Sequence, residues 1–227
     1  MSQPKKQPYI VSWSGGKDSC LALTRAIQAF DAPRFLLNML TENAERSRSH
    51  GLRKTVIQAQ ADALGVPILF YSATWDDYEN TFITALQELK NKGIEMGVFG
   101  DMKIENRPDW IAHRQWAERV CHQAKIRAHE PLWDDTEECL LSDFWASRIK
   151  AKIISVKANL LDKKYLGESL TPALVDEFIQ QGIHPLGETG EYHTVVFDSP
   201  LFSYPLNLRS GECILREGYW YLDVEKI

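Results

Sequence analysis

Short apolar runs alternate with longer segments of helical periodicity along the first half of the chain. The runs are rich in β-branched and aromatic residues, whereas apolar residues recur every three or four positions in the segments between them. This pattern predicts strands at 9–13, 34–40, 68–72, 96–100 and 127–129. It predicts a first helix starting near residue 17 and further helices at 52–64, 76–90 and 108–125. Strands that alternate with helices in this way form parallel βαβ units with right-handed crossovers. The predicted fold class is therefore α/β, with a doubly wound, mainly parallel sheet.

The pattern changes after residue 133, where strands and helices no longer alternate regularly. We expect helices at 135–149 and 172–181, and strands at 152–156, 193–197, 213–216 and 219–222. The last two strands flank Glu217 and Gly218, which is a hairpin signal. We therefore expect two domains, one at 1–133 and a smaller α+β C-terminal domain at 134–227.

Composition and charge describe an ordinary globular protein. Hydrophobic residues make up 44% of the 227 residues, charged residues make up 25%, and the net charge is −5. An acidic balance argues against general nucleic-acid binding. The sequence contains no apolar run of eighteen residues, so we expect no membrane-spanning helix. Four scattered cysteines and a polar N-terminus without the apolar core of a signal peptide predict a reduced, cytoplasmic protein.

A polar turn follows the first apolar strand directly. Its six residues are Ser14, Gly15, Gly16, Lys17, Asp18 and Ser19. The first N–H groups of a helix lack intrahelical partners and carry a partial positive charge, so a strand, a glycine turn and a helix start can bind phosphate. The two serines offer hydroxyls and Lys17 offers a cation. Asp18 is suited to Mg²⁺ or to a helix cap.

The spacing of this turn differs from Walker A, which places four residues between its first glycine and Gly-Lys-Ser/Thr. The order Ser-Gly-Gly-x-Asp-Ser after a first strand instead resembles the PP-loop of the ATP pyrophosphatases, in the adenine-nucleotide α-hydrolase-like superfamily. The resemblance implies that the loop binds the pyrophosphate of ATP and that the bond between the α- and β-phosphates is cleaved.

Polar residues also follow the other predicted strands. Thr41, Ser72, Gly100 and Asp101 lie at their carboxyl ends, and His50 lies in the loop after the second strand. Ligands of doubly wound sheets bind beyond the carboxyl ends of the strands. We therefore expect Gly100 and His50 near the nucleotide, with Asp101 as a second catalytic carboxylate. A solvent-exposed loop position for His50 and an ordinary loop carboxylate for Asp101 are equally open.

A second polar segment precedes the strand at 193–197. It places two carboxylates, two glycines and a histidine within eight residues, from Gly187 to Thr194. Carboxylates suit an amine or an ammonium ion, and a histidine suits proton transfer. The residues alone do not separate a binding site from a solvated turn.

This segment sharpens the resemblance. Gly-Glu-x-Gly-Glu-Tyr-x-Thr at 187–194, followed by Asp-Ser-Pro-Leu-Phe at 198–202, is similar to the C-terminal signature of the diphthine–ammonia ligase family. Gly100-Asp101 and Glu130-Pro131-Leu132-Trp133 agree in order, so that the resemblance covers residues 9–202. It implies that Glu188, Gly190, Glu191, His193 and Thr194 bind the substrate.

Two features depart from the family pattern. Diphthine–ammonia ligases usually carry a glutamate where this chain has His193. The stretch from Arg46 to Leu52 and the His113-Arg114 pair resemble the bacterial branch of the family. Bacteria do not make diphthamide, so the resemblance implies ATP chemistry on an acceptor other than diphthine.

The resemblance implies a two-step ligation with ATP and Mg²⁺. A carboxylate of a small molecule or a protein attacks the α-phosphorus, pyrophosphate leaves, and ammonia converts the acyl-adenylate to an amide with release of AMP. Lys17, Asp18 and Asp101 are the expected catalytic residues, and Asp18 is the expected Mg²⁺ ligand. The 227 residues leave no room for a glutaminase, so we expect free ammonia or ammonia from a partner. The oligomeric state stays open, with a homodimer included.

Two other functions fit the same loop. One is a PP-loop enzyme that modifies tRNA, but the acidic balance and the absence of a C-x-x-C pair argue against it. The other is a regulatory module that binds ATP without turnover. On the helix at 108–125, Glu118 is four residues from Arg114, and we favour a structural pair over a catalytic role. Cys121 on the same helix is expected to be buried.

Overall fold

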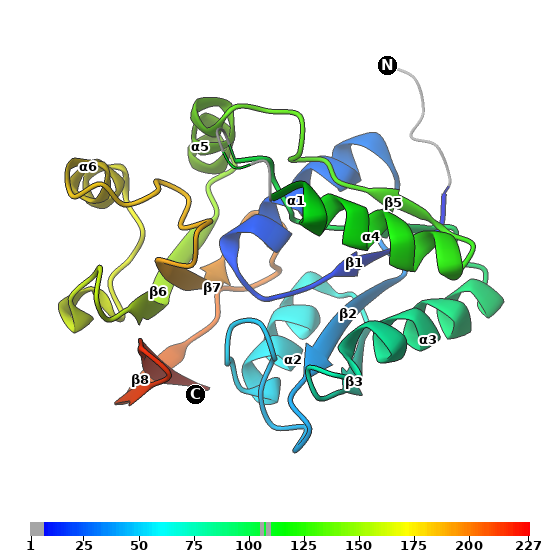
Figure 1. Cartoon of the computed structure of the whole chain (residues 1–227), viewed down its shortest axis with the longest axis horizontal. Helices are drawn as coiled ribbons and strands as arrows, with labels where there is room; N and C mark the ends of the chain where they lie inside the picture. The colour runs from blue at the N-terminus through cyan, green and yellow to red at the C-terminus, as the bar shows by residue number, and fades with distance from the viewer. Residues whose placement is uncertain (1–6, 105–106, 108–109) are drawn as a thin grey trace.

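The first half of the chain forms a parallel sheet flanked by helices (Figure 1). The computed structural model describes residues 7–104, 107 and 110–227. The strands of this sheet are β1 (Tyr9–Ser12), β2 (Phe35–Leu40), β3 (Ile68–Ser72), β4 (Met96–Val98) and β5 (Arg127–His129). Their order is β3-β2-β1-β4-β5, and every neighbouring pair is parallel. The chain winds outward in both directions from β1, which confirms the predicted doubly wound α/β fold.

Helices cover both faces of this sheet. They are α1 (Lys17–Ala29), α2 (Lys54–Leu64), α3 (Tyr78–Asn91) and α4 (Ile111–Gln123). Because successive strand residues point to opposite faces, Tyr9 and Val11 pack with α1 and α2, whereas Ile10 packs with α3 and α4. The predicted first turn of the fourth helix, at Pro108 and Asp109, lies outside the described residues.

The second half of the chain forms an antiparallel sheet. Its strands are β6 (Lys150–Lys157), β7 (Tyr192–Asp198), β8 (Leu208–Arg216) and β9 (Tyr219–Lys226), in the order β7-β6-β9-β8. The helical elements of this half are α5 (Glu137–Ala146), η2 (Lys163–Tyr165) and α6 (Pro172–Gln180). The predicted hairpin is confirmed with longer strands, and Glu217 and Gly218 both have positive φ, as a tight hairpin turn requires.

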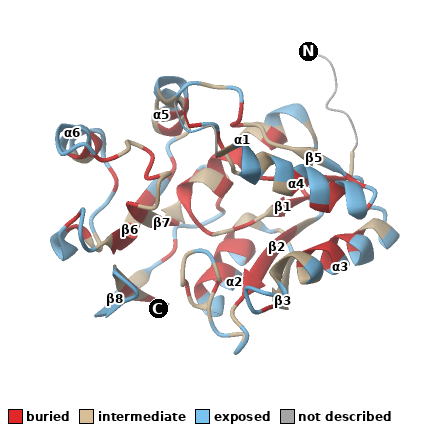
Figure 2. Cartoon of the chain, in the orientation of Figure 1, coloured by how far each residue is buried: buried red, intermediate tan, exposed pale blue. Residues whose placement is uncertain are grey.

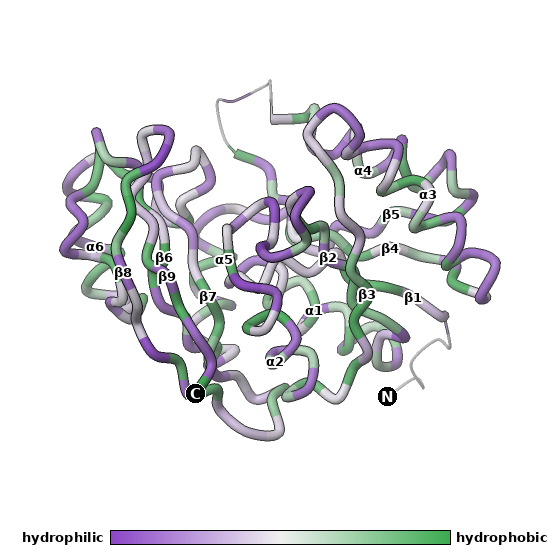
Figure 3. The backbone as a smooth tube through the Cα atoms, turned by 90° about the horizontal axis from the view of Figure 1, so that it is seen from below, coloured by the Kyte–Doolittle hydropathy of each residue, from purple (hydrophilic) through white to green (hydrophobic). Residues whose placement is uncertain are grey.

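The two sheets lie at opposite ends of the molecule, with α1 and α2 between them (Figures 1 and 3). One hydrophobic core joins the halves, because Cys20 and Leu23 of α1 belong to the same cluster as Ile153 and Val195 of the second sheet. Buried residues are concentrated along this junction, whereas β8 is largely exposed (Figure 2). The boundary at residue 133 falls between β5 and α5 and stays a prediction.

Two further expectations concern single features of the chain. Within the described ranges, no helix combines the length and the apolar character needed to cross a membrane. Cys121 is buried on α4, as predicted, and Glu118 accepts a hydrogen bond of 3.0 Å from Arg114 on the same helix.

Candidate functional site

A cavity of about 750 Å³ lies at the carboxyl ends of β1, β2 and β4. Its wall includes Ser14 after β1, Asn38 and Met39 of β2, and Gly100 and Asp101 after β4. Residues 187–190 and 192–194 complete the wall from the second half of the chain. The volume lies in the range of small-molecule sites. The polar segments at 14–19 and 187–194, which are distant in sequence, therefore share one cavity.

The turn after β1 forms a compact network of hydrogen bonds. The Ser14 hydroxyl accepts the Gly16 N–H at 3.3 Å and donates to the Ser19 hydroxyl at 3.1 Å. The Ser19 hydroxyl in turn donates to the Gly16 carbonyl at 3.0 Å. These bonds hold the turn at the start of α1, with Ser14, Lys17, Asp18 and Ser19 lining the cavity.

At two positions near the turn, neighbouring atoms come so close to the backbone that only glycine fits. A Cβ on Gly16 would lie 3.0 Å from Nδ1 of His50 and even closer to Cε1 of that ring. A Cβ on Gly100 would lie 2.9 Å from the Ser19 nitrogen. The missing side chains let the Gly100 backbone pack against the start of α1 and let the His50 ring lie against Gly16.

Lys17 is buried, and its ammonium reaches residues of the second half of the chain. Its ammonium donates to the Leu186 carbonyl and to the Asp18 carboxylate, the latter at 2.9 Å. Glu188 lies 3.9 Å from the same nitrogen. Lys17, which is predicted from the sequence to contact pyrophosphate, therefore also holds segment 187–194 against the turn at 14–19.

Three carboxylates face one another across the cavity. Burial raises the pKa of Glu188 well above its usual range, and the Asp18 charge raises it further. Burial also raises the pKa of Asp101, with a smaller contribution from Asp18. Lys17 offsets only part of this negative charge, and a divalent cation would relieve the remainder.

The residues present fit Mg²⁺ only together with a phosphate ligand. Among the described residues, no three His, Cys, Asp or Glu side chains are grouped so as to hold a metal ion. Protein-bound Mg²⁺ usually takes one or two carboxylates and completes its shell with phosphate and water oxygens. Asp18 and Asp101, which line the cavity together, satisfy that requirement.

Two histidines stack at the side of the cavity. The rings of His50 and His193 lie 4.6 Å apart between centroids, with an interplanar angle of 32°. Burial and the nearby Lys17 charge lower the pKa of His193 to about 4. Burial and the His193 and Lys17 charges lower the pKa of His50 well below its usual range. Both rings are therefore neutral at pH 7, and Nδ1 of His50 has no hydrogen-bond partner within the described chain.

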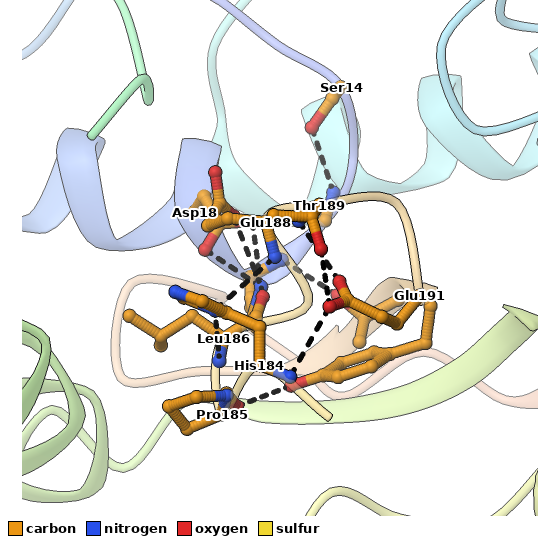
Figure 4. Close-up of polar contacts among 12 residues, drawn as sticks. Ser14, Asp18, His184, Pro185, Leu186, Glu188, Thr189 and Glu191 are labelled. Carbon is orange, nitrogen blue, oxygen red and sulfur yellow. Dashed lines mark hydrogen bonds and ion pairs between the residues drawn. The ribbon is translucent and has the colours of Figure 1, made fainter. Parts of the chain in front are cut away.

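Segment 187–194 divides into residues that face the cavity and one that lies behind it. Glu188, Gly190, His193 and Thr194 line the cavity. Glu191 is buried and accepts hydrogen bonds from the Thr189 N–H at 2.9 Å, the Thr189 hydroxyl and the His184 N–H (Figure 4). Of the five predicted substrate ligands, Glu191 alone is occupied by the segment itself.

Gln60 of α2 is a site residue that the sequence analysis missed. Its side chain is fully buried and donates to the Gly15 carbonyl at 2.9 Å and to the Val196 carbonyl at 2.7 Å. Its oxygen accepts the indole N–H of Trp13 at 3.0 Å. A signal was available, because Gln60 lies four residues after Val56, on the apolar face of its helix.

Aromatic side chains form another wall that the sequence analysis did not single out. Trp75, Tyr78, Trp110 and Trp116 line the cavity on the side of α3 and α4. Tyr78 lies 5.6 Å from Trp75 and 5.8 Å from Trp116 between ring centroids. Such a wall suits a flat ligand group. These residues come from two segments, 75–78 and 110–116, that are far apart in the sequence, so sequence spacing does not group them.

Comparison with known proteins gives two matches to family models. Residues 7–128 match the diphthamide synthase N-terminal domain, and residues 135–227 match the diphthamide synthase C-terminal domain.

Individual relatives agree with these matches. The chain is 29% identical to the diphthine–ammonia ligases of Mus musculus and Homo sapiens, over 90% of this chain and 84% of each relative. Among solved structures, a predicted subunit of tRNA methyltransferase from Methanocaldococcus jannaschii aligns with a TM-score of 0.45 and 14% identity. That alignment covers 86% of this chain and 98% of the other.

Proposed function

This chain belongs to the diphthamide synthase family, and we propose that it is an ATP-dependent carbon–nitrogen ligase that converts a carboxylate to an amide. The observation that carries the proposal is the shared cavity, in which the phosphate-binding turn at 14–19 faces the family signature at 187–194. The diphthine–ammonia ligases to which the chain is similar support the reaction class.

The proposed reaction has two steps. An oxygen of the acceptor carboxylate bonds to the α-phosphorus of ATP, and the bond from that phosphorus to the bridging oxygen breaks, releasing pyrophosphate. The nitrogen of ammonia then bonds to the acyl carbon, AMP leaves with the acceptor oxygen, and the nitrogen loses a proton. The first step develops negative charge on pyrophosphate, so positive groups at the turn favour it.

Residues of the turn at 14–19 would bind the phosphates of ATP and stabilise the leaving pyrophosphate. We assign the phosphates to the start of α1, where the N–H groups of Asp18 and Ser19 have no acceptor among the described residues. Asp18 and Asp101 would hold Mg²⁺, which supplies charge neutralisation for the phosphates when bound. Lys17 adds positive charge beside them and anchors Leu186.

The acceptor is assigned to the side of the cavity formed by 187–194 and His50. Two neutral imidazoles there accept or donate hydrogen bonds without adding charge. A glutamate at position 193, as in the family pattern, would add a negative charge. We therefore propose that the acceptor differs from diphthine, in line with the resemblance to the bacterial branch.

Product analysis tests the reaction class. The protein is incubated with Mg-ATP, ammonium and fractions of a metabolite extract from its source, and AMP is separated from ADP. AMP with pyrophosphate, stimulated by particular fractions, is the expected result. ADP with phosphate contradicts cleavage between the α- and β-phosphates, and ATP binding without any product in every fraction favours a regulatory module.

Two further measurements test the role of His193 in acceptor choice and the source of the nitrogen. His193→Glu is expected to change which fractions stimulate turnover, and unchanged preference counts against a role of His193 in acceptor choice. Activity that requires glutamine and ignores ammonium would contradict free ammonia as the donor.

The tRNA-modifying alternative has less support from the thiols. Cys20, on the helix of the turn, is fully buried, and burial raises its pKa to about 12. A thiol of that kind is a poor nucleophile for sulfur transfer. Tight tRNA binding that weakens steeply with salt would favour this alternative over the amide ligase.

A further inference from the structure

Helix α1 begins without a cap from its own neighbours. Its N-cap residue is Gly16, which has no side chain. In α5 and α6 the caps are local, because Thr136 and Thr171 each accept the N–H three residues later. In α1 the Lys17 N–H instead donates to the hydroxyl oxygen of Thr194 at 3.0 Å. That oxygen belongs to β7 and is 177 residues away in the chain.

The same strand also fixes the residue before the helix. The Val196 N–H donates to the Gly15 carbonyl at 2.9 Å. The Gln60 amide donates to both the Gly15 and the Val196 carbonyls and so links the turn and β7 a second time. The peptide groups from Gly15 to Lys17 are therefore oriented by the second sheet and by α2.

This arrangement separates the polar groups that are satisfied from those that are left for a ligand. The Lys17 N–H is occupied by Thr194, whereas the next two N–H groups of α1 have no acceptor among the described residues, and both of their residues, Asp18 and Ser19, line the cavity. Because consecutive peptide groups in a helix share one orientation, fixing the first one fixes the two that follow.

Thr194 also has little surface with which to touch an acceptor. Its exposed fraction is 1%, while its neighbour His193 is partly exposed in the cavity. The Thr194 side chain therefore contacts the turn at 14–19 and not the open part of the cavity.

We infer that Thr194 is a positioning residue for the nucleotide phosphates and does not select the acceptor, an inference that rests on the proposed function. The threonine of the C-terminal signature then serves the ATP half of the reaction, although it lies in the other half of the chain. Gln60 has the same role from α2.

Binding of ATP and of adenosine to the full chain tests this inference by calorimetry, without the acceptor. Thr194→Val keeps the shape of the side chain and removes the hydroxyl, leaving a buried N–H unpaired. We expect ATP binding to weaken about tenfold, whereas adenosine binding changes less than about twofold, because only the phosphates use the turn. Thr194→Ser is expected to restore ATP binding to within about threefold of wild type.

Thr24→Val is the matched control, since Thr24 lies on the same helix and, among the residues that the structure describes, its hydroxyl bonds only the Cys20 carbonyl. Gln60→Glu provides a second route if Thr194→Val does not fold, because it keeps the acceptor for Trp13 and removes at least one of the two N–H donors. It is expected to weaken ATP binding in the same way, with Gln58→Ala on the exposed face of α2 as its control.

Wild-type ATP affinity in Thr194→Val and Gln60→Glu would overturn the inference. An equal loss for ATP and adenosine would also overturn it, because it indicates a general structural effect. Wild-type protein that binds no ATP at all would instead overturn the proposed function, so the two failures are distinguishable.

Discussion

The backbone of segment 14–19 is fixed by residues far away in the chain as well as by its own serines, whereas segment 187–194 is shaped from within by the Glu191 carboxylate. In the first, the backbone is fixed by Thr194, Val196 and Gln60. In the second, Glu191 bonds Thr189 and the nearby His184. The comparison indicates that in the first segment the Asp18 carboxylate lines the cavity, whereas in the second segment one carboxylate, that of Glu191, determines the shape of the backbone.

The largest expected effect is on chemistry in the first segment. Asp18→Ala removes a carboxylate from the proposed Mg²⁺ and phosphate site, so pyrophosphate release should fall by about 100-fold or more. Stability should change by less than about 0.5 kcal/mol, because loss of the bond to Lys17 is offset by reduced repulsion of Glu188 and Asp101. Product chromatography and urea unfolding measure the two effects.

The exposed residue Asp176 on α6 supplies the control, and Asp176→Ala should change neither quantity. Retained pyrophosphate release in Asp18→Ala would remove Asp18 from the mechanism and weaken the contrast between the two segments.

A second variant addresses shape in the other segment. Glu191→Gln replaces an acceptor by a donor opposite groups that themselves donate, so that a buried hydrogen bond to a charged group is lost. We expect the free energy of unfolding to fall by about 2 kcal/mol. Urea unfolding is the measurement, with Glu168→Gln at an exposed position as the control. Unchanged stability together with lost activity would place Glu191 in substrate binding, as the sequence analysis expected.

His193, within segment 187–194, predicts a pH dependence of stability. The pKa of His193 is lowered by burial to about 4, below its unfolded value near 6.5. As pH falls from about 6.5 toward 4, His193 is therefore protonated in the unfolded chain but stays neutral in the folded chain. The free energy of unfolding decreases over that window. At pH 7.5 both states are neutral and this loss is absent.

Comparison of wild type with His193→Gln isolates this contribution. Between pH 7.5 and 4.5 the wild type should lose roughly 2 kcal/mol more than the variant. His122→Gln, on the exposed side of α4, should retain the wild-type pH dependence. A His193 imidazole that titrates near pH 6.5 by NMR would contradict the buried, neutral pair.

The smallest effect is expected outside both segments. Glu118 and Arg114 form an exposed pair on α4, and such pairs contribute little to stability. Glu118→Gln should change the free energy of unfolding by less than about 0.5 kcal/mol and leave pyrophosphate release unchanged. A tenfold loss of activity in this variant would instead give Glu118 a role in catalysis.

Periodicity was sufficient to predict the fold, because β1 to β4 lie in distinct apolar runs bounded by polar residues, whereas β5 is a short strand with a single apolar residue, Ala128. The rule for doubly wound sheets also placed Ser14 and Asp101 at one end of the sheet. The boundaries were less predictable: the expected helix at 135–149 is observed at Glu137–Ala146.

The contacts within the site were not predictable in the same way. The carbonyl that Lys17 contacts belongs to Leu186, an apolar residue whose side chain gives no sign of it. Glu188 and Glu191 have the same side chain and lie three residues apart, yet only Glu188 lines the cavity. Their difference arises from the backbone path between Gly187 and Gly190, which a single sequence does not specify.

The bond from Lys17 to Thr194 has a consequence for the order in which the chain becomes functional. It joins residues 177 positions apart, so it is among the least local contacts of the fold and its formation costs a large chain entropy. During synthesis at about 5–20 residues per second, Thr194 is added roughly 10 to 35 s after Lys17. The turn at 14–19 is therefore among the first parts of the nascent chain to be made, but it acquires its final shape only after β7 has been translated.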